Sequence, residues 1–148
     1  MFRPPQVDEV LWEVEREHLD EAEFLLEVLG RALDAPHYRL DEVAKGPERR
    51  LLAHIDGLVV GGPVVARDLL AATCADPEAD PATVAAAALA IAATRDRNAI
   101  EELLASLDGR PVAEASFFAR ALAACPSDEL DARLVDRLPR SGDRGAAI

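Results

Sequence analysis

The chain has 148 residues, of which 50% are apolar and 4% aromatic, and it carries a formal net charge of −12. This length corresponds to one domain with a core of its own, and the apolar share argues against intrinsic disorder. The negative charge disfavours binding to nucleic acids and to anionic membranes, because both require a basic surface. Ala, Leu and Val dominate the apolar residues, which favours closely packed helices over a β-sandwich.

The first predicted element is a long amphipathic helix from about Asp8 to Leu33. Apolar residues recur along it with the helical period of 3.6 residues, and acidic residues occupy the remaining positions. The same spacing also fits the heptads of a coiled coil. The apolar face is wider than a coiled-coil seam, however, so we expect the helix to pack on its own domain.

Two shorter helices are predicted after a loop at 34–38. The pattern favours one helix over Leu40–Lys45 and a second that starts at Pro47. Proline is favoured in the first turn of a helix because its missing N–H would have no partner there. The second helix is predicted to end at Gly61 and Gly62, which interrupt the pattern.

From Pro63 onward the predicted helices follow one another at regular intervals, with starts near positions 63, 81, 97, 111 and 127. Intervals of about 14 to 18 residues make helix pairs of roughly 32 residues, near the lower end of helical solenoid repeats. Short turns force successive helices to be antiparallel, and Asp80 and Ser127 are placed to cap two of them. The sequence therefore predicts an all-α fold, a short right-handed α-solenoid of HEAT-like antiparallel helix pairs after the long N-terminal helix.

One helical-repeat domain is predicted over residues 1–138, with an N-terminal module at 1–62, helix pairs at 63–138 and a disordered tail at 139–148. The N-terminus lacks the apolar stretch of a signal peptide, and the most apolar run is too short to span a bilayer. We therefore expect a cytoplasmic location. Cys74 and Cys125 lie in Ala-rich helical patterns and are expected to be small core residues, with a disulfide between them left open.

Three segments of the first sixty residues, with Arg31 between them, carry a family resemblance: His18–Leu25, Ala35–Leu40 and Glu48–Leu58. They resemble the start of an uncharacterised proteobacterial family of HEAT-like repeat proteins. Members of that family are typically longer, and their genes often lie beside type VI secretion genes. The resemblance implies helical repeats and a role around effector loading or neutralisation, and it implies no catalytic residues.

Metal binding is the alternative function that the residues suggest. Glu15 and His18 have the Glu-x-x-His spacing that places both side chains on one helix face, as in di-iron bundles. A second copy of this spacing is missing, because His37 falls in a loop and His54 has Leu51 three residues before it. A helical histidine that is hydrogen-bonded to a neighbour is the simpler interpretation. A small metal-binding protein or enzyme that uses Glu15, His18, His37 and His54 remains the alternative.

Protein binding is the function that we favour. No serine or cysteine has the context of a nucleophile, and no glycine-rich segment has the pattern of a phosphate loop. We therefore predict a non-catalytic interaction module without a cofactor, whose basic partner is an effector or a toxin domain. A truncated repeat protein that self-associates through its C-terminal repeat is a further alternative. The candidate contacts are Phe24, Glu13, Asp20, Glu27, Phe117 and Phe118.

Overall fold

The computed structural model describes residues 10–107, 114–124 and 127–137. Within these ranges the chain forms seven continuous helical segments and no strand. The prediction of an all-α fold is therefore confirmed. The predicted helix start at Pro111, the second cysteine, Cys125, and the tail at 139–148 lie outside the described residues.

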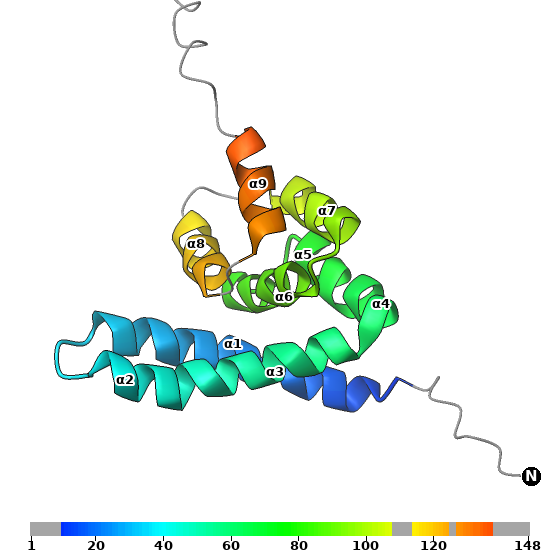
Figure 1. The fold of residues 1–148 in the computed structure, drawn as a ribbon. Helices are drawn as coiled ribbons and strands as arrows, with labels where there is room; N and C mark the ends of the chain where they lie inside the picture. Colours follow the sequence, from blue (N-terminus) through cyan, green and yellow to red (C-terminus); the bar gives the residue numbers. More distant parts are fainter. Residues whose placement is uncertain (1–9, 108–113, 125–126, 138–148) are drawn as a thin grey trace, which may run out of the picture.

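A long helical hairpin forms the base of the fold. Helix α1 (Trp12–Asp34) is followed by a loop, and the chain returns as one continuous helix made of α2 (Leu40–Val43), the π-helical segment η1 (Ala44–Glu48) and α3 (Arg49–Val60). The two arms lie side by side (Figure 1). One face of α1 is buried, which confirms the predicted amphipathic helix. Its buried residues are Leu19, Ala22, Leu25, Leu29 and Ala32.

Pro47 lies inside the returning helix, so the predicted break before it is wrong. A proline within a regular α-helix loses a hydrogen bond, and its ring clashes with the preceding turn. Here the proline lies in the π-helical segment η1, whose wider turn relieves the clash. The helix therefore continues through Pro47.

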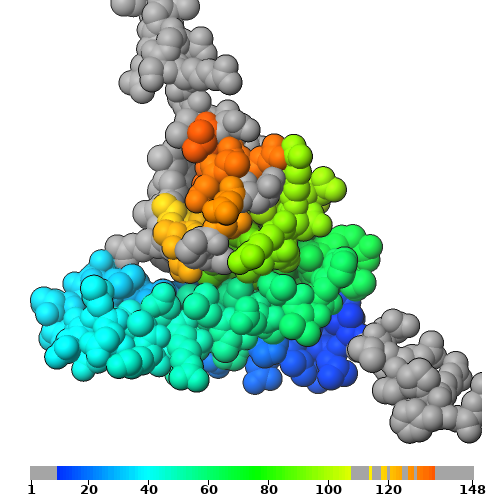
Figure 2. Space-filling view, in the orientation of Figure 1, coloured from blue at the N-terminus to red at the C-terminus, as the bar shows by residue number. Residues whose placement is uncertain are grey.

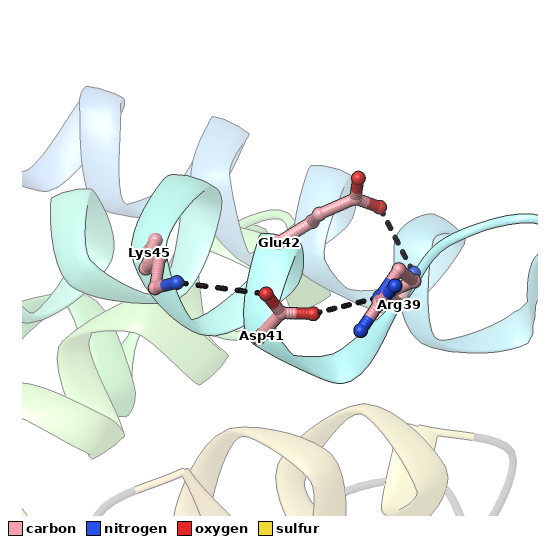
Figure 3. A network of polar contacts seen from close by, with 4 residues as sticks. All are labelled: Arg39, Asp41, Glu42 and Lys45. Carbon is pink, nitrogen blue, oxygen red and sulfur yellow. Dashed lines mark hydrogen bonds and ion pairs between the residues drawn. The ribbon is translucent and has the colours of Figure 1, made fainter.

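Exposed polar contacts hold the start of α2. The Oε2 atom of Glu42 accepts a hydrogen bond from the backbone N–H of Arg39 at 3.1 Å. Asp41 accepts a hydrogen bond from the Arg39 guanidinium at 3.1 Å and lies 3.5 Å from Nζ of Lys45 (Figure 3). Carboxylates are favourable in the first turn because the N–H groups there lack helical partners. These contacts mark where the second arm of the hairpin begins, although exposed ion pairs each add little stability.

Two glycines turn the chain after α3, as predicted. The next continuous helix comprises α4 (Gly62–Val65), the π-helical segment η2 (Ala66–Ala71) and α5 (Ala72–Ala75). Gly62 has a φ of +76°, in the left-handed region that glycine adopts without strain. The helices on the two sides of this point are bent by 104° relative to each other. The chain thus leaves the direction of the hairpin here.

Helix α6 (Pro81–Thr94) occupies the centre of the fold. It contacts α1 and α3 of the hairpin, the helix over 62–75, α7 (Arg97–Leu107) and α8 (Ala115–Ala123). It is consequently buried on every side, and each residue from Val84 to Ala92 is at most 2% exposed. Its run of alanines allows the neighbouring helix axes to approach closely, as the sequence predicts.

Polar contacts fix both the start of α6 and its position against α1. The carboxylate of Asp80 accepts a hydrogen bond from the N–H of Ala82 at 2.8 Å, which confirms the predicted cap. The hydroxyl of Thr83 donates to Glu23 at 2.6 Å and links α6 directly to α1. These contacts satisfy polar groups at the edge of a core that is otherwise apolar.

The C-terminal helices pack on the side of α6 that faces away from the hairpin (Figures 1 and 2). Helix α9 (Asp128–Arg137) begins at Ser127, whose hydroxyl accepts a hydrogen bond from the N–H of Leu130 at 3.3 Å. The predicted cap at Ser127 is therefore confirmed. A small second core joins α6, α7 and α9. Its buried residues are Ala92, Ile100, Leu104 and Leu130.

Cys74 is 2% exposed, in agreement with the prediction that it is a core residue. Within the described part of the chain, no single helix combines the length and apolarity that crossing a membrane requires. Only the bent pair Leu40–Val60 and Gly62–Ala75 meets that test, and only when its two helices are counted together.

We expect truncation of the central helix to be costly. Leu89 is 0% exposed in the middle of α6, so Leu89→Ala removes buried methyl groups and leaves a cavity. The free energy of unfolding should fall by about 2–5 kcal/mol, measured by urea denaturation. Val60 is 86% exposed, and the control Val60→Ala should change it by less than about 0.5 kcal/mol. Similar losses for the two variants would show that α6 is not the core.

Candidate functional site

An exposed stripe on α1 contains all the contact residues predicted on that helix. It consists of Glu13, Glu17, Asp20, Phe24 and Glu27, all of which are exposed. Successive members are three or four residues apart, so they share one side of the helix, opposite the buried face. Phe24 is 52% exposed and lies off the apolar face. We call these five residues the acidic stripe.

Only one member of the acidic stripe forms an ion pair within the described residues. Glu27 lies 3.8 Å from Arg31, an exposed pair. Across the described ranges, no ion pair engages Glu13, Glu17 or Asp20. The stripe therefore combines four carboxylates with one solvent-exposed aromatic ring along the same side of α1. Such a surface attracts cations over the Debye length and offers apolar area for burial once contact is made.

The two adjacent phenylalanines of α8 do not form part of this surface. Phe118 is 8% exposed and packs in the main core, so it is a structural residue. Its assignment as a partner contact has no support from its position. The side chain of Phe117 lies outside the described part of the structure.

A second cluster is polar and lies between α1 and α3. His18 of α1 and His54 of α3 face each other, with their Nδ1 atoms 3.0 Å apart and their ring centroids 5.2 Å apart. The hydrogen bond predicted for His18 is therefore present, and its partner is His54. Glu15 lies one turn before His18 on α1, and its Oε2 atom is buried without a hydrogen-bond partner.

Of the four residues of the metal-binding alternative, His37 does not lie with the His18–His54 pair. His37 is exposed in the loop that follows α1, where its ring lies 4.8 Å from that of Tyr38. Among the residues that the structure describes, no group of three or more His, Cys, Asp or Glu side chains is placed to hold a metal ion. The His18–His54 pair can therefore be described as a hydrogen bond in which one Nδ1 carries the proton and the other accepts it.

Gly57 of α3 and Gly61, directly after that helix, make room for the polar side chains of α1. A Cβ atom at Gly57 would lie 2.8 Å from the ring of His18, and one at Gly61 would lie 3.0 Å from the carboxylate of Glu15. The glycines are four positions apart, so both face the same side of the helix. At Gly57 the close approach of α1 and α3 depends on the missing side chain, whereas a Cβ at Gly61 would also meet Val65 of α4. The Gly-x-x-x-Gly spacing was the sequence signal for this contact, and the prediction overlooked it.

Comparisons of the chain with family models, with curated proteins and with solved structures found no match.

We expect Gly57→Ala to destabilise the hairpin because the new methyl group would overlap the His18 ring. The free energy of unfolding should fall by about 1–3 kcal/mol, the usual cost of overpacking. Combining it with His18→Ala should remove part of that loss, because the two residues are in contact.

Gly46 is the matched control, since a Cβ there meets nothing within 4 Å. Gly46→Ala should leave stability unchanged or raise it by up to about 1 kcal/mol. Equal losses in the two alanine variants would contradict the close approach.

Proposed function

We propose that the protein is a non-catalytic protein-binding module that presents the acidic stripe of α1 to a basic partner. The observation that carries the proposal is Phe24, which is 52% exposed among four carboxylates of a 23-residue helix. Exposed rings of this kind are the residues that anchor protein interfaces once their pocket excludes water. The net charge of −12 would add attraction to the same kind of partner.

The dimensions of the stripe fit a partner helix or an extended basic segment. Glu13 and Glu27 are 14 positions apart, which corresponds to roughly 21 Å along a helix. A partner helix of about four turns would match this length, with an apolar side chain opposite Phe24 and Lys or Arg residues on both sides of it. The charges would mainly raise the association rate, and the ring would slow dissociation.

We also propose that the helices from Gly62 onward form short HEAT-like pairs. The contacts between elements support this arrangement. The helix over 62–75 would pair with α6, and α7 with α8. The helix over 62–75 contacts α7, and α7 contacts α9, so the first helices of successive pairs lie together. The second helices do the same, because α6 contacts α8. Repeat units of a solenoid touch their neighbours in this way. Helix α1 is an addition to the pattern, since it packs across α3 and α6.

The family resemblance extends this proposal to a biological setting. Under it the protein is an accessory or immunity-type component of a type VI secretion locus, acts in the cytoplasm, and binds a basic effector or toxin domain. Of the two alternatives, self-association has one favourable observation, because Leu134 and Val135 of α9 are 38% and 65% exposed. The metal-binding alternative gains only the His18–His54 contact, and we do not propose it.

Binding can be measured by fluorescence anisotropy with a labelled amphipathic peptide that is rich in Lys and Leu. We expect Asp20→Lys to weaken binding about tenfold or more, and Phe24→Ala by a similar factor, because each removes a central contact worth more than about 1 kcal/mol. The weakening should diminish at high salt for the charge variant only.

The control for this experiment is Glu102→Lys, which makes the same charge change at an exposed position of α7. It should weaken binding by no more than about twofold, because a single distant charge is largely screened. If Asp20→Lys and Glu102→Lys weaken binding equally, the peptide senses only net charge and the acidic stripe is not the binding surface.

A further inference from the structure

The two histidines between α1 and α3 constrain how many protons they bind together. Their Nδ1 atoms are 3.0 Å apart, so one proton must lie between them for a hydrogen bond to form. A neutral pair meets this requirement, and so does a pair that carries one extra proton on an outer nitrogen. A second extra proton places N–H groups on both Nδ1 atoms, directed at each other, and sets two positive charges side by side. The contact cannot persist in that state.

The charged groups around the pair come from both helices. On α1, Glu15 lies one turn before His18, and Glu21 lies about one turn after it. The buried Oε2 of Glu15 has no hydrogen-bond partner. On α3, Arg50 lies one turn before His54 and is 4.0 Å from Glu21, so these two charges largely offset each other. One carboxylate thus remains to balance the pair.

Packing prevents the rings from simply turning away. The ring of His18 lies on Gly57, where even a methyl group would be 2.8 Å from it. Both histidines are only partly exposed. We therefore expect separation of the rings to move α1 relative to α3, so that protonation of the pair weakens the contact between the two arms of the hairpin.

We propose that His18 and His54 form a proton-sensitive clamp between α1 and α3. The clamp is closed while the pair holds at most one extra proton, and the second extra proton opens it in mildly acidic solution. This inference rests on the geometry of the hairpin and is independent of the proposed binding function.

The sign of the pH effect follows from proton counting. In the unfolded chain the two imidazoles are far apart and each binds a proton freely at a pH below about 6. The folded pair resists the second of these protons. The unfolded state therefore binds more protons in this range, and stability falls as the pH falls. Where the unfolded chain no longer binds the second extra proton, the contribution of the clamp is fully present.

The direct test is a pH titration of the intact protein by NMR, with ¹⁵N-labelled histidine and EDTA present so that no metal ion bridges the two nitrogens. We expect the ring nitrogens of His18 and His54 to change in two separate steps, because interacting sites titrate as a pair. In His54→Gln, His18 should change in one step. If both rings of the wild-type protein titrate together in a single step while the hairpin stays folded, the clamp does not exist.

Thermal unfolding at pH 7.5 and pH 5.0 gives a second readout. The His54→Gln substitution keeps a hydrogen-bonding side chain on α3, but the amide that it introduces cannot take up a proton. We expect the melting temperature of the wild-type protein to fall by about 4 °C more than that of His54→Gln between the two pH values. His37→Gln, in the exposed loop, is the control and should respond to pH as the wild type does. An equal fall for wild type and His54→Gln would overturn the proposal.

Discussion

Burial of one helix on all of its sides is the constraint on which the rest of the structure depends. Helix α6 consists mainly of alanine, and its residues from Val84 to Ala92 are at most 2% exposed. A helix of small side chains gains little from burying any single one of them, so its stability comes from many close contacts with several neighbours. The hairpin, the helix over 62–75 and α8 supply those contacts. Every other helix can then remain amphipathic, with one face on the core and one face in water.

Packing against this core leaves the outer face of helix α1 free as a binding surface. Its inner face is used in the core, and it is positioned by the Thr83–Glu23 hydrogen bond and by the notches at Gly57 and Gly61. Its outer face is thereby held in one orientation and carries the acidic stripe. A binding surface on a rigid helix loses little conformational entropy when a partner arrives. The polar seam with α3 lies on the inner face, on the side of α1 opposite the acidic stripe, so a change in protonation there acts on the element that would meet the partner.

Much of the fold could be predicted from the sequence because its signals are local. Helical periodicity, the caps at Asp80 and Ser127 and the break at the two glycines all act within a few residues, and all are confirmed. Pro47 was misread because the π-helical turn that accommodates it depends on the tertiary course of the chain. The meeting of His18 and His54 was also missed, since 36 positions separate them and no periodicity links two helices. The exposure of Phe24 was predictable from the helical face alone, whereas Phe118 was buried by packing that only the assembled helices define.

The central position of α6 can be tested most directly by amide hydrogen exchange on the intact protein. Groups that exchange only when the whole domain unfolds mark its most stable unit, and peripheral helices exchange through smaller openings. We expect the amides of residues 84–92 to be the slowest and to show the free energy of global unfolding, while those of α2 and α9 exchange faster. Exchange in α6 as fast as in α2, well below the global free energy, would contradict the view that the fold is built around this helix.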